Sequence, residues 1–303
     1  MQKQPLVTII TVVYNLINSN REDCFKQCLE SVHNQSYDNI EHIIVDGASE
    51  DGTLDLIKEY ANKGWIKYIS EPDSGLYDAM NKGATLAQGE YLAFMNSDDF
   101  YSDLDGIAKC IDQLTMTNAD FSYAKANILG GKKGQFKKHE YLNPKLFKVY
   151  THMPFSHQTL IVKKEVFEKF GKYDLTYKSA SDYDFILKMV LNGCSSVYCK
   201  FFMATFRLGG FSLENSDLSN NEIASFYQKY YGKYHQMSHE DAKKTYLRKK
   251  LPFKLILKIV KTLKPTDKIL FLLSQYTSLR RELVSFRFSK IENRLKLFRK
   301  KIF

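Results

Sequence analysis

Apolar segments rich in β-branched residues alternate with amphipathic segments along the first third of the chain, and this alternation restricts the possible folds most strongly. The apolar segments predict buried strands, and the amphipathic segments predict helices between them. Strict alternation of strand and helix is typical of a doubly wound, mostly parallel α/β sheet flanked by helices. The predicted strands are residues 6–13, 40–45, 66–69 and 91–95, and the predicted helices are residues 22–35, 52–61 and 77–87.

The pattern changes after residue 100, where the predicted elements no longer alternate strictly. We expect antiparallel strands to extend the sheet here, as they do in many large α/β enzymes. The tail from about residue 222 predicts helices that break near Pro252 and Pro265. The other expected elements are helices at 105–114 and 181–191 and strands at 120–128, 134–138, 159–162 and 196–206.

Charge divides the chain into an acidic body and a basic tail. Residues 243–303 contain 19 Lys and Arg and three acidic residues, whereas the whole chain of 303 residues has a net charge of only +10. The body is therefore mildly acidic, which argues against nucleic acid as a partner of the folded domain. We predict a catalytic domain over residues 1–235 and a basic, amphipathic helical tail over residues 236–303.

The cysteines and the hydropathy of the chain bear on its location. The five cysteines are odd in number, and no Cys or His spacing completes a zinc site, so we interpret them as reduced thiols. We recognise no secretory leader and no run of about 18 apolar residues, the length that a transmembrane helix needs. These observations predict a reducing, cytoplasmic location without a transmembrane helix.

Polar residues follow the first two predicted strands. A dinucleotide-binding fold needs a G-x-G-x-x-G turn after the first strand, but the chain has no glycine before Gly47, so this fold is excluded. The second strand ends in Asp46, and the Ser, Gly and Thr residues of 47–53 can hydrogen-bond a base or a ribose. The same segment also fits a tight turn in which Ser49 or Asp51 caps the next helix.

The loop after the third predicted strand, residues 71–83, gathers carboxylates, an amide and a lysine around the start of a helix. Anions bind readily at helix N-termini, so this loop is a candidate anion-binding segment. A capped helix with a solvated face explains Asp78 and Lys82 equally well.

The fourth predicted strand brings two adjacent carboxylates, Asp98 and Asp99, to its exit. Two like charges repel, and burial raises the pKa of a carboxyl group unless a cation is present. A hard divalent ion such as Mg²⁺ or Mn²⁺ removes this conflict, because it takes oxygen ligands and leaves positions for phosphate oxygens. Acidic turn residues that face water are the other interpretation of this pair.

Further polar residues stand out in the second half of the chain. Asp182 lies at the start of the predicted helix 181–191, where the helix dipole also favours an acidic residue, and Asp184 points to a different side. His157 and Gln158 follow an apolar segment and precede a predicted strand. A lone histidine is more often structural than catalytic, so the neighbours of His157 are the reason to consider it.

Taken in order, these segments resemble the inverting family-2 glycosyltransferases of the GT-A fold, a group that builds bacterial surface polysaccharides. The resemblance covers about residues 5–210 and implies a GT-A-type α/β domain. It rests on six segments in the order and spacing of the family, at residues 11–15, 46–53, 71–83, 89–99, 155–158 and 181–182.

The resemblance also implies roles for individual residues. Asp182 matches the catalytic base of the family, and Asp98 matches the metal ligand of its D-x-D motif, with Asp99 as support. His157 and Gln158 belong to the acceptor or phosphate side. The implied donor-binding positions are Thr11, Tyr14, Asn15, Asp46, Ser49, Asp73, Gly75, Asn81, Lys82, Asn96 and Ser97.

Two positions depart from the family pattern. Asn96 replaces the usual first Asp of the D-x-D motif; an amide still bonds a ribose hydroxyl but removes one negative charge. Gly47 replaces a frequent second Asp, which affects recognition of the base. Because Asp98, Asp99 and Asp182 are all present, we retain the enzyme hypothesis.

The implied function is that of a hexosyltransferase that moves a sugar, with inversion, from a nucleotide-sugar donor to a saccharide or lipid-linked acceptor in cell-surface polysaccharide synthesis. UDP is the nucleotide that the resemblance favours, and Mg²⁺ or Mn²⁺ is the expected cofactor. A nucleotidyltransferase is a second hypothesis, although residues 13–20 lack the Gly-rich, basic loop of that class. A non-catalytic sugar- or partner-binding protein on the same scaffold and an RNA-binding protein that uses the tail are the others.

Apolar and basic residues share a helical spacing in the tail. Such helices lie in the membrane interface with their lysines toward anionic headgroups, so we predict peripheral attachment to the inner face of the cell membrane. A helical cap packed on the acidic body is the other interpretation. The apolar positions are Leu251, Leu255, Ile256, Ile259, Val260 and Leu263, and the basic positions between them are Lys254, Lys258 and Lys261.

Overall fold

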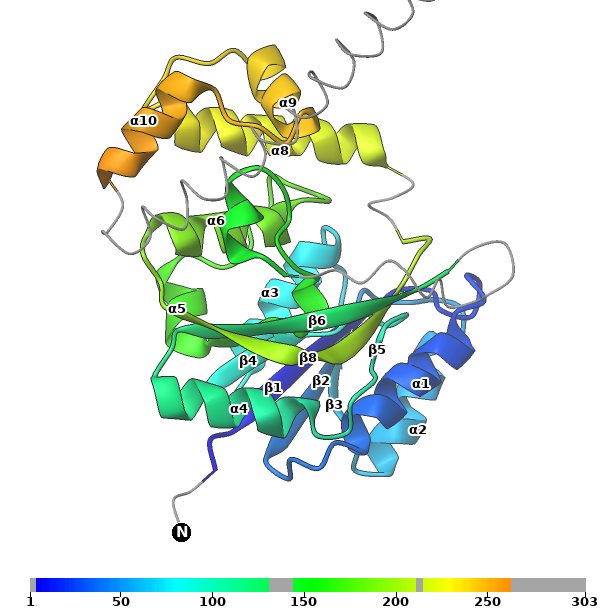
Figure 1. The fold of residues 1–303 in the computed structure, drawn as a ribbon. Coiled ribbons are helices and arrows are strands. Elements are labelled where there is room, and N and C mark those ends of the chain that lie inside the picture. The colour runs from blue at the N-terminus through cyan, green and yellow to red at the C-terminus, as the bar shows by residue number, and fades with distance from the viewer. Residues whose placement is uncertain (1–3, 131–143, 211–214, 263–303) are drawn as a thin grey trace, which may run out of the picture. The chain divides into compact units, whose positions relative to one another are not determined.

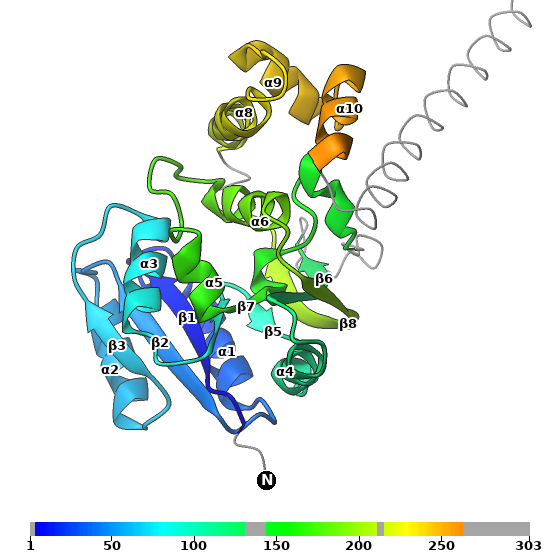
Figure 2. The ribbon, with the colours of Figure 1, turned by 90° about the vertical axis from the view of Figure 1, so that its left-hand side faces the viewer.

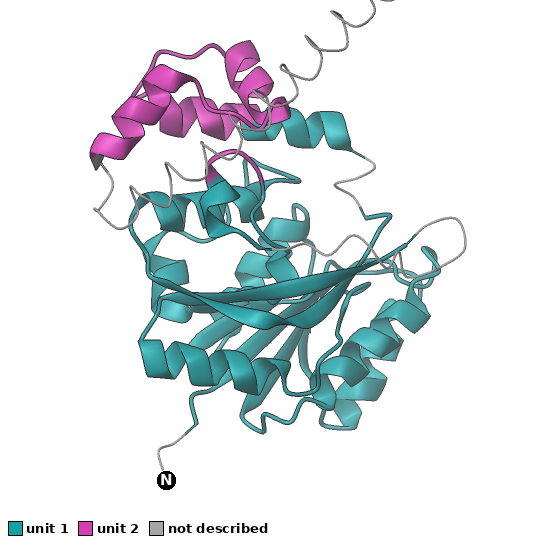
Figure 3. Ribbon diagram, in the orientation of Figure 1, with its two compact units in different colours: residues 1–149, 153–223 teal, residues 150–152, 224–303 magenta. Residues whose placement is uncertain are grey.

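The computed structural model describes residues 4–130, 144–210 and 215–262 (Figure 1). The chain divides into two compact units (Figure 3). Unit 1 comprises residues 1–149 and 153–223, and unit 2 comprises residues 150–152 and 224–303. Every residue predicted to act in catalysis, donor binding or metal binding belongs to unit 1.

The first half of unit 1 follows the predicted alternation of strand and helix, which is confirmed. The observed bounds differ from the predicted ones by at most two residues, because apolar periodicity specifies these elements locally. The elements are β1 (Val7–Val13), α1 (Glu22–His33), β2 (Ile40–Asp46), α2 (Thr53–Asn62), β3 (Lys67–Ser70), α3 (Leu76–Leu86) and β4 (Tyr91–Phe94).

The second half of unit 1 adds strands and helices close to the expected positions. The strand predicted at 159–162 begins at Ile161, because the N–H group of Thr159 bonds the carbonyl of Ser156 and closes a short 3-10 turn. The strand predicted at 134–138 lies outside the described residues. The elements are β5 (Phe100–Tyr101), α4 (Gly106–Thr117), β6 (Phe121–Leu129), η1 (Leu146–Tyr150), η2 (His157–Thr159), β7 (Ile161–Lys163), α5 (Lys164–Lys169), α6 (Ser181–Leu191) and β8 (Ser196–Arg207).

The strands of the described residues form one sheet of eight, in the order β3-β2-β1-β4-β7-β6-β8-β5. The first four strands in this order are parallel, β7 is antiparallel to both of its neighbours, and β5 is antiparallel to β8. Helices α1, α2 and α4 cover one face of the sheet, and α3, α5 and α6 lie on the other (Figure 2). The doubly wound, mostly parallel prediction is therefore confirmed.

A cluster of aromatic rings connects α5 and α6 to the sheet on the second face. Phe167 contacts Phe94 of β4, Phe185 of α6 and Tyr173, with ring centroids 4.9–5.3 Å apart. Each of these side chains is at most 2% exposed, and burial of a phenylalanine contributes about 1.5–3 kcal/mol to stability. This packing fixes the start of α6, which carries Asp182, above the end of β4.

The carboxyl ends of three parallel strands lie level with one another. Val13 of β1 pairs with Asp46 of β2, and Asp46 pairs with Ser70 of β3. The loops that follow these strands therefore meet at one edge of the sheet, where ligands bind in folds of this type.

Unit 2 is helical in its described part. It contains the second half of α8 (Ser216–Tyr231), α9 (His239–Leu247) and α10 (Phe253–Thr262). Pro252 directly precedes α10, as predicted, whereas Pro265 and the rest of residues 263–303 lie outside the described residues. We predicted a boundary at 235/236, and the two compact units divide earlier, between residues 223 and 224 within α8.

Helix α10 has one buried and one exposed face. The buried face contains Leu255 and Ile259, and Leu251 just before the helix is also buried. The exposed face combines Phe253 and Leu257, which are 72% and 48% exposed, with the exposed lysines Lys254, Lys258 and Lys261. No helix in the described ranges is long and apolar enough to cross a membrane.

Candidate active site

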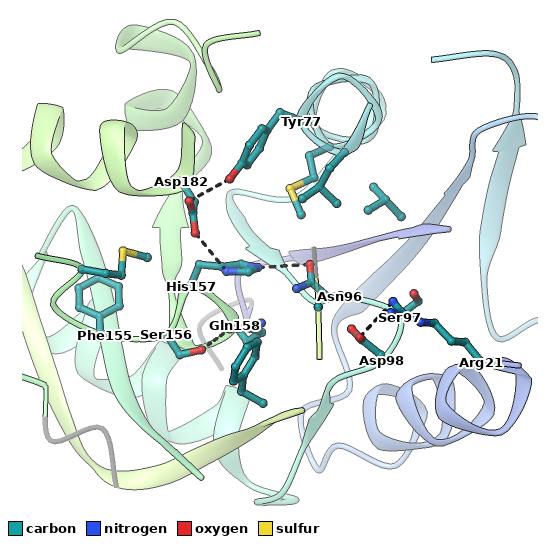
Figure 4. A pocket seen from close by; sticks show the side chains of 16 residues that line it. Arg21, Tyr77, Asn96, Ser97, Asp98, Phe155, Ser156, His157, Gln158 and Asp182 are labelled. Carbon is teal, nitrogen blue, oxygen red and sulfur yellow. Dashed lines mark hydrogen bonds and ion pairs between the residues drawn. The ribbon is translucent and has the colours of Figure 1, made fainter. Parts of the chain in front are cut away.

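A cavity of about 340 Å³ lies in unit 1 where the ends of β1 and β4 face the starts of α3 and α6 (Figure 4). Six of the predicted site residues line it, namely Asn96, Ser97, Asp98, His157, Gln158 and Asp182. The structure thus brings together residues that are far apart in the sequence. The other lining residues are Val12, Arg21, Leu76, Tyr77, Met80, Met153, Phe155, Ser156, Phe206 and Gly210.

Asp182 occupies one end of the cavity, in the first turn of α6. Its carboxylate accepts hydrogen bonds from the hydroxyl of Tyr77 at 2.9 Å and from the backbone N–H of Tyr183 at 2.9 Å. The Nδ1 atom of His157 lies 3.3 Å from the other carboxylate oxygen. Burial disfavours the charged form, but His157, Tyr77 and the Tyr183 N–H outweigh it, so the pKa of Asp182 lies below its usual range.

His157 connects the two ends of the cavity. Its Nε2 atom lies 3.3 Å from the side-chain oxygen of Asn96, while its Nδ1 atom faces Asp182. The next residue, Gln158, donates from its amide to Asp99. His157 and Gln158 therefore link Asp182 to the residues that follow β4.

The two adjacent carboxylates after β4 have different environments. Asp99 is fully buried and accepts hydrogen bonds from the N–H of Arg207 at 2.7 Å and from the amides of Gln158 and Asn96. Burial, followed by the neighbouring charge of Asp98, raises the pKa of Asp99 to about 7. Asp98 instead lines the cavity, where its carboxylate forms an ion pair with Arg21 at 3.2 Å.

Most of the other predicted donor-binding residues form a second group in the loops after β1, β2 and β3. Asp46 is fully buried, and its carboxylate accepts hydrogen bonds from the hydroxyls of Ser49 and Ser70 at 2.5 and 2.6 Å. Asn15 donates its N–H to Ser49, and its side chain accepts from the N–H of Glu50. These contacts fix the loops to one another at the edge of the sheet.

Tyr14, Gly47 and Asp73 lie close together in these loops. A side chain at position 47 would lie 2.7 Å from the Asp73 carboxylate and 3.2 Å from the Tyr14 ring, so the glycine allows both to approach. Tyr14 is 64% exposed. Burial is the main cause that raises the pKa of Asp73, whose carboxylate accepts the N–H of Gly75 at 2.8 Å. An exposed ring beside an acceptor is a suitable surface for a nucleobase.

Three of the predicted donor-binding residues bond to protein groups instead of lining the cavity. Thr11 is fully buried, and its hydroxyl lies 3.0 Å from His42. The amide of Asn81 exchanges two hydrogen bonds with the backbone of Tyr173. Lys82 pairs with Glu71 at 2.9 Å and donates to the carbonyl of Pro72. Asn81 and Lys82 thus hold α3 and its loop in place, and Thr11 connects β1 to β2.

The segment before α6 is held by a buried carboxylate. Glu222 of α8, which is 7% exposed, accepts the N–H groups of Lys178, Ser179 and Ala180 at 2.7–3.1 Å. The hydroxyls of Ser179 and Ser219 lie 2.7 Å apart. Three successive backbone donors on one carboxylate define the path of the chain into the turn that carries Asp182.

The sequence matches the family model of glycosyl transferase family 2 over residues 8–182, which is more than half of the chain. The chain belongs to this family. Its matched segment runs from β1 to the predicted base, Asp182, and so includes both groups of site residues.

The chain is similar to two mycobacterial proteins. An uncharacterized glycosyltransferase of Mycobacterium tuberculosis is 29% identical over 207 residues, which cover 63% of this chain and 71% of the relative. A PGL/p-HBAD biosynthesis glycosyltransferase of Mycobacterium bovis is 31% identical over 173 residues, which cover 54% of this chain and 64% of the relative. The chain is therefore a glycosyltransferase, and one of its relatives is a PGL/p-HBAD biosynthesis glycosyltransferase.

Solved structures confirm the GT-A fold. TarS (residues 1–349) of S. aureus, in complex with UDP-GlcNAc, has a TM-score of 0.58 and 18% identity, with 88% of this chain and 78% of that chain covered. The mannosyltransferase PcManGT of Pyrobaculum calidifontis, with GDP-Man and Mn²⁺, has a TM-score of 0.58 and 17% identity, with 86% and 74% covered. At these identities the likeness establishes the fold alone.

Four residues at the family-2 site were not predicted from the sequence: Arg21, Tyr77, Arg207 and Glu222. Arg21 had a recognisable signal, because a cation at the N-terminus of a helix opposes the helix dipole and needs a reason. No such sequence signal marks Arg207 or Glu222, because their hydrogen-bond partners are more than 40 residues away in the chain.

Within residues 4–130, 144–210 and 215–262, no group of three or more His, Cys, Asp and Glu side chains forms a metal-binding cluster. Of the adjacent carboxylates Asp98 and Asp99, which we predicted as metal ligand and support, Asp98 lines the cavity.

Proposed function

We propose that this family-2 glycosyltransferase moves a sugar from a nucleotide-sugar donor to a hydroxyl group of a saccharide or lipid-linked acceptor, with inversion at the anomeric carbon. The supporting observation is that Asp182 and Asp98 line one cavity from opposite ends, with His157 and Asn96 between them (Figure 4). An in-line displacement needs the base and the leaving diphosphate on opposite sides of the sugar. A sugar between Asp182 and Asp98 would have the base on one side and the diphosphate on the other.

The reaction is a single displacement. The acceptor oxygen attacks the anomeric carbon while Asp182 takes its proton, and the bond from that carbon to the diphosphate oxygen breaks with its electron pair on the diphosphate. Asp182 is ionised for this task because its pKa lies below the usual range. Tyr77 and His157 bind its two oxygens and so orient it. A positioned base of this kind contributes about 10²–10⁴-fold to the rate.

A divalent ion, when bound, neutralises the charge that develops on the leaving diphosphate. Asp98 is the residue that would hold it, because its carboxylate faces the cavity, whereas the Asp99 carboxylate is buried and bonded to protein donors. One carboxylate is sufficient for Mg²⁺, which fills its other positions with water and substrate phosphates. The residues present therefore fit a metal bound together with the donor, and Asp99 supports the turn that presents Asp98.

The donor is inferred to bind with its nucleotide over the loops after β1, β2 and β3. The exposed Tyr14 ring offers a stacking surface, and Asp73 offers an acceptor for a base or ribose group. TarS was solved with UDP-GlcNAc and PcManGT with GDP-Man, so fold relatives of both nucleotide types are known. We infer UDP for this chain, and a role in cell-surface polysaccharide synthesis at the inner face of the membrane.

The exposed face of α10 is the proposed membrane contact. Phe253 and Leu257 lie among three exposed lysines on this face. Apolar side chains of this kind enter the headgroup region, while each lysine near an anionic surface adds about 1 kcal/mol of attraction. An enzyme with a lipid-linked acceptor benefits from this location because its substrate is confined to the same surface.

The test of the proposed reaction uses the full-length protein, Mn²⁺ and a panel of nucleotide sugars. We expect consumption of one UDP-sugar, with NMR of the first product showing the opposite anomeric configuration to the donor. Retention of configuration would contradict the single displacement. Binding of UDP without consumption of any sugar nucleotide would instead support a non-catalytic binding protein on this scaffold.

A further inference from the structure

Arg21 reaches into the cavity at the end opposite Asp182. Its Nη1 atom lies 3.2 Å from the Oδ2 atom of Asp98, and both side chains line the cavity. The Arg21 side chain is 40% exposed and that of Asp98 is 17% exposed. Within the described part of the chain, Asp98 is the single polar partner of the Arg21 side chain.

A second arginine nearby is held quite differently. The guanidinium of Arg207 donates to the carbonyl of Asp98 and to the side chain of Gln27, and it lies 4.9 Å from the ring centre of Phe100. Its backbone N–H also bonds Asp99. Arg207 is therefore a fixed part of the turn, whereas Arg21 can change partner by breaking a single, partly buried ion pair.

The position of Arg21 at the start of α1 is unfavourable for a cation unless an anionic group lies close to it. It is the residue before α1, where the partial positive charge of the helix dipole repels a cation. The acidic residues Glu22 and Asp23 in the first turn reduce this repulsion, but neither forms an ion pair with Arg21 among the described contacts. A cation held at this point suits an anion that enters the cavity.

We propose that Arg21 is a diphosphate-binding residue that rests on Asp98 without donor and moves onto the donor's diphosphate when the donor binds. This inference rests on the proposed function, in which the diphosphate lies at the Asp98 end of the cavity. Arginine binds phosphate oxygens through parallel N–H donors, which makes it well suited to a leaving diphosphate.

Because of this ion pair, Arg21 and a divalent ion compete for the carboxylate of Asp98. The guanidinium of Arg21 and a divalent ion are both cations that are attracted to the Asp98 carboxylate and repel each other, so each weakens the binding of the other at rest. Transfer of Arg21 to the diphosphate releases the carboxylate, so donor and metal bind more tightly together than either does alone. Loss of Arg21 should therefore raise the affinity for the divalent ion and lower the affinity for the nucleotide. A purely structural role of Arg21 does not give these opposite changes.

The test measures two affinities of full-length Arg21→Ala. Titration of the donor-free protein with Mn²⁺, followed by electron paramagnetic resonance of free Mn²⁺, should show binding at least about two- to fivefold tighter than wild type, because an ion pair in contact with solvent has about this strength and this pair is partly buried. Calorimetric titration with UDP in excess chelator should show binding weaker by about tenfold or more, because a charged hydrogen-bond donor is lost. Lys26→Ala on α1, whose ion pair with Glu22 does not involve Asp98, is the matched control and should change neither affinity.

The Asp98→Ala variant distinguishes a failure of the role of Arg21 from a failure of the metal site in the proposed function. If Asp98→Ala loses Mn²⁺ binding while Arg21→Ala leaves both affinities at the wild-type values, the role of Arg21 is wrong and the metal site stands. If Asp98→Ala keeps full Mn²⁺ affinity, the metal assignment of the proposed function fails as well. A parallel fall of both affinities in Arg21→Ala would show a structural role and overturn the inference.

Discussion

Asp182 can act as a base near neutral pH because three donors stabilise its charged form. Burial acts against the charge, and His157, Tyr77 and the N–H of Tyr183 outweigh it. Tyr173 is the other titratable group close to this carboxylate, and burial together with the Asp182 charge raises the pKa of its hydroxyl, so it stays neutral. The acidic limb of the rate profile should therefore lie below the usual range of an aspartate.

Replacement of Tyr77 by Phe removes one of these donors and keeps the ring. The pKa of Asp182 should then rise, and because the base must be ionised, the acidic limb of kcat/KM should move to higher pH. At pH 8 the rate should fall by about tenfold or less, the value of one hydrogen bond. The full pH profile of the variant is the measurement, with Tyr68→Phe on β3 as control. An unchanged acidic limb would mean that Tyr77 does not act on the base.

The position of a single residue could be predicted where the residue lies at the end or the start of an element. Asp182, Asp98 and His157 follow or begin predicted elements, so their presence at the cavity follows from the topology. Thr11 and Asp46 were assigned to the donor by resemblance, and their side chains instead bond within the protein. Sequence position identifies the loop, but it does not specify which side chain turns inward to hold the loop together.

At the scale of elements, the path of the chain into α6 depends on another helix. Glu222 of α8 binds three successive N–H groups before α6. Hydrogen bonds to a charged group are worth about 1.5–3 kcal/mol each. The carboxylate thus determines where the first turn of α6, and with it Asp182, is placed.

Glu222→Gln should lower kcat by about 10- to 100-fold while the dissociation constant for UDP stays within about twofold, because small displacements of a catalytic group have effects of this size. Ser219→Ala is the control, since it removes a hydroxyl contact to the same segment and leaves the carboxylate. Kinetics and UDP titration of both variants are the measurements. If the Glu222→Gln variant lost UDP binding and its circular dichroism spectrum became that of an unfolded chain, the role of Glu222 would be to stabilise unit 1 as a whole. It would then not be a residue that positions the base.

The strands and helices themselves could be predicted because their apolar patterns are local. The order of strands beyond β4 could not, since β7 lies between β4 and β6, and β5 pairs with β8 more than 100 residues away. Pairing over such distances depends on packing of the completed core, which no short segment encodes.

At the scale of the molecule, charge separates the catalytic part from the proposed membrane contact. The acidic body and the basic tail were visible in the sequence, and the described part of the tail is helical. The sequence did not show which face of α10 would be covered. Burial of Leu255 and Ile259 leaves Phe253 and Leu257 among the lysines as the apolar groups most exposed on this helix.

The membrane contact can be tested by neutralising these lysines. Replacement of Lys254, Lys258 and Lys261 by Gln removes three basic groups, each worth about 1 kcal/mol near an anionic surface, so affinity for anionic liposomes should fall about a hundredfold. Donor hydrolysis should not change. Sedimentation with liposomes at low salt is the measurement, and Lys26, Lys58 and Lys63 replaced by Gln form the control with equal charge. Equal binding by both triple variants would contradict the assignment of α10.

The proposed mechanism depends on Asp182 as the base of the transfer. The most direct measurement compares turnover and UDP affinity in Asp182→Asn, which keeps the shape of the side chain and removes the proton acceptor. We predict that kcat falls by about 10²–10⁴-fold while the dissociation constant for UDP is unchanged. Near-normal turnover, or a loss of UDP affinity in place of turnover, would contradict the assignment of the base and with it the proposed mechanism.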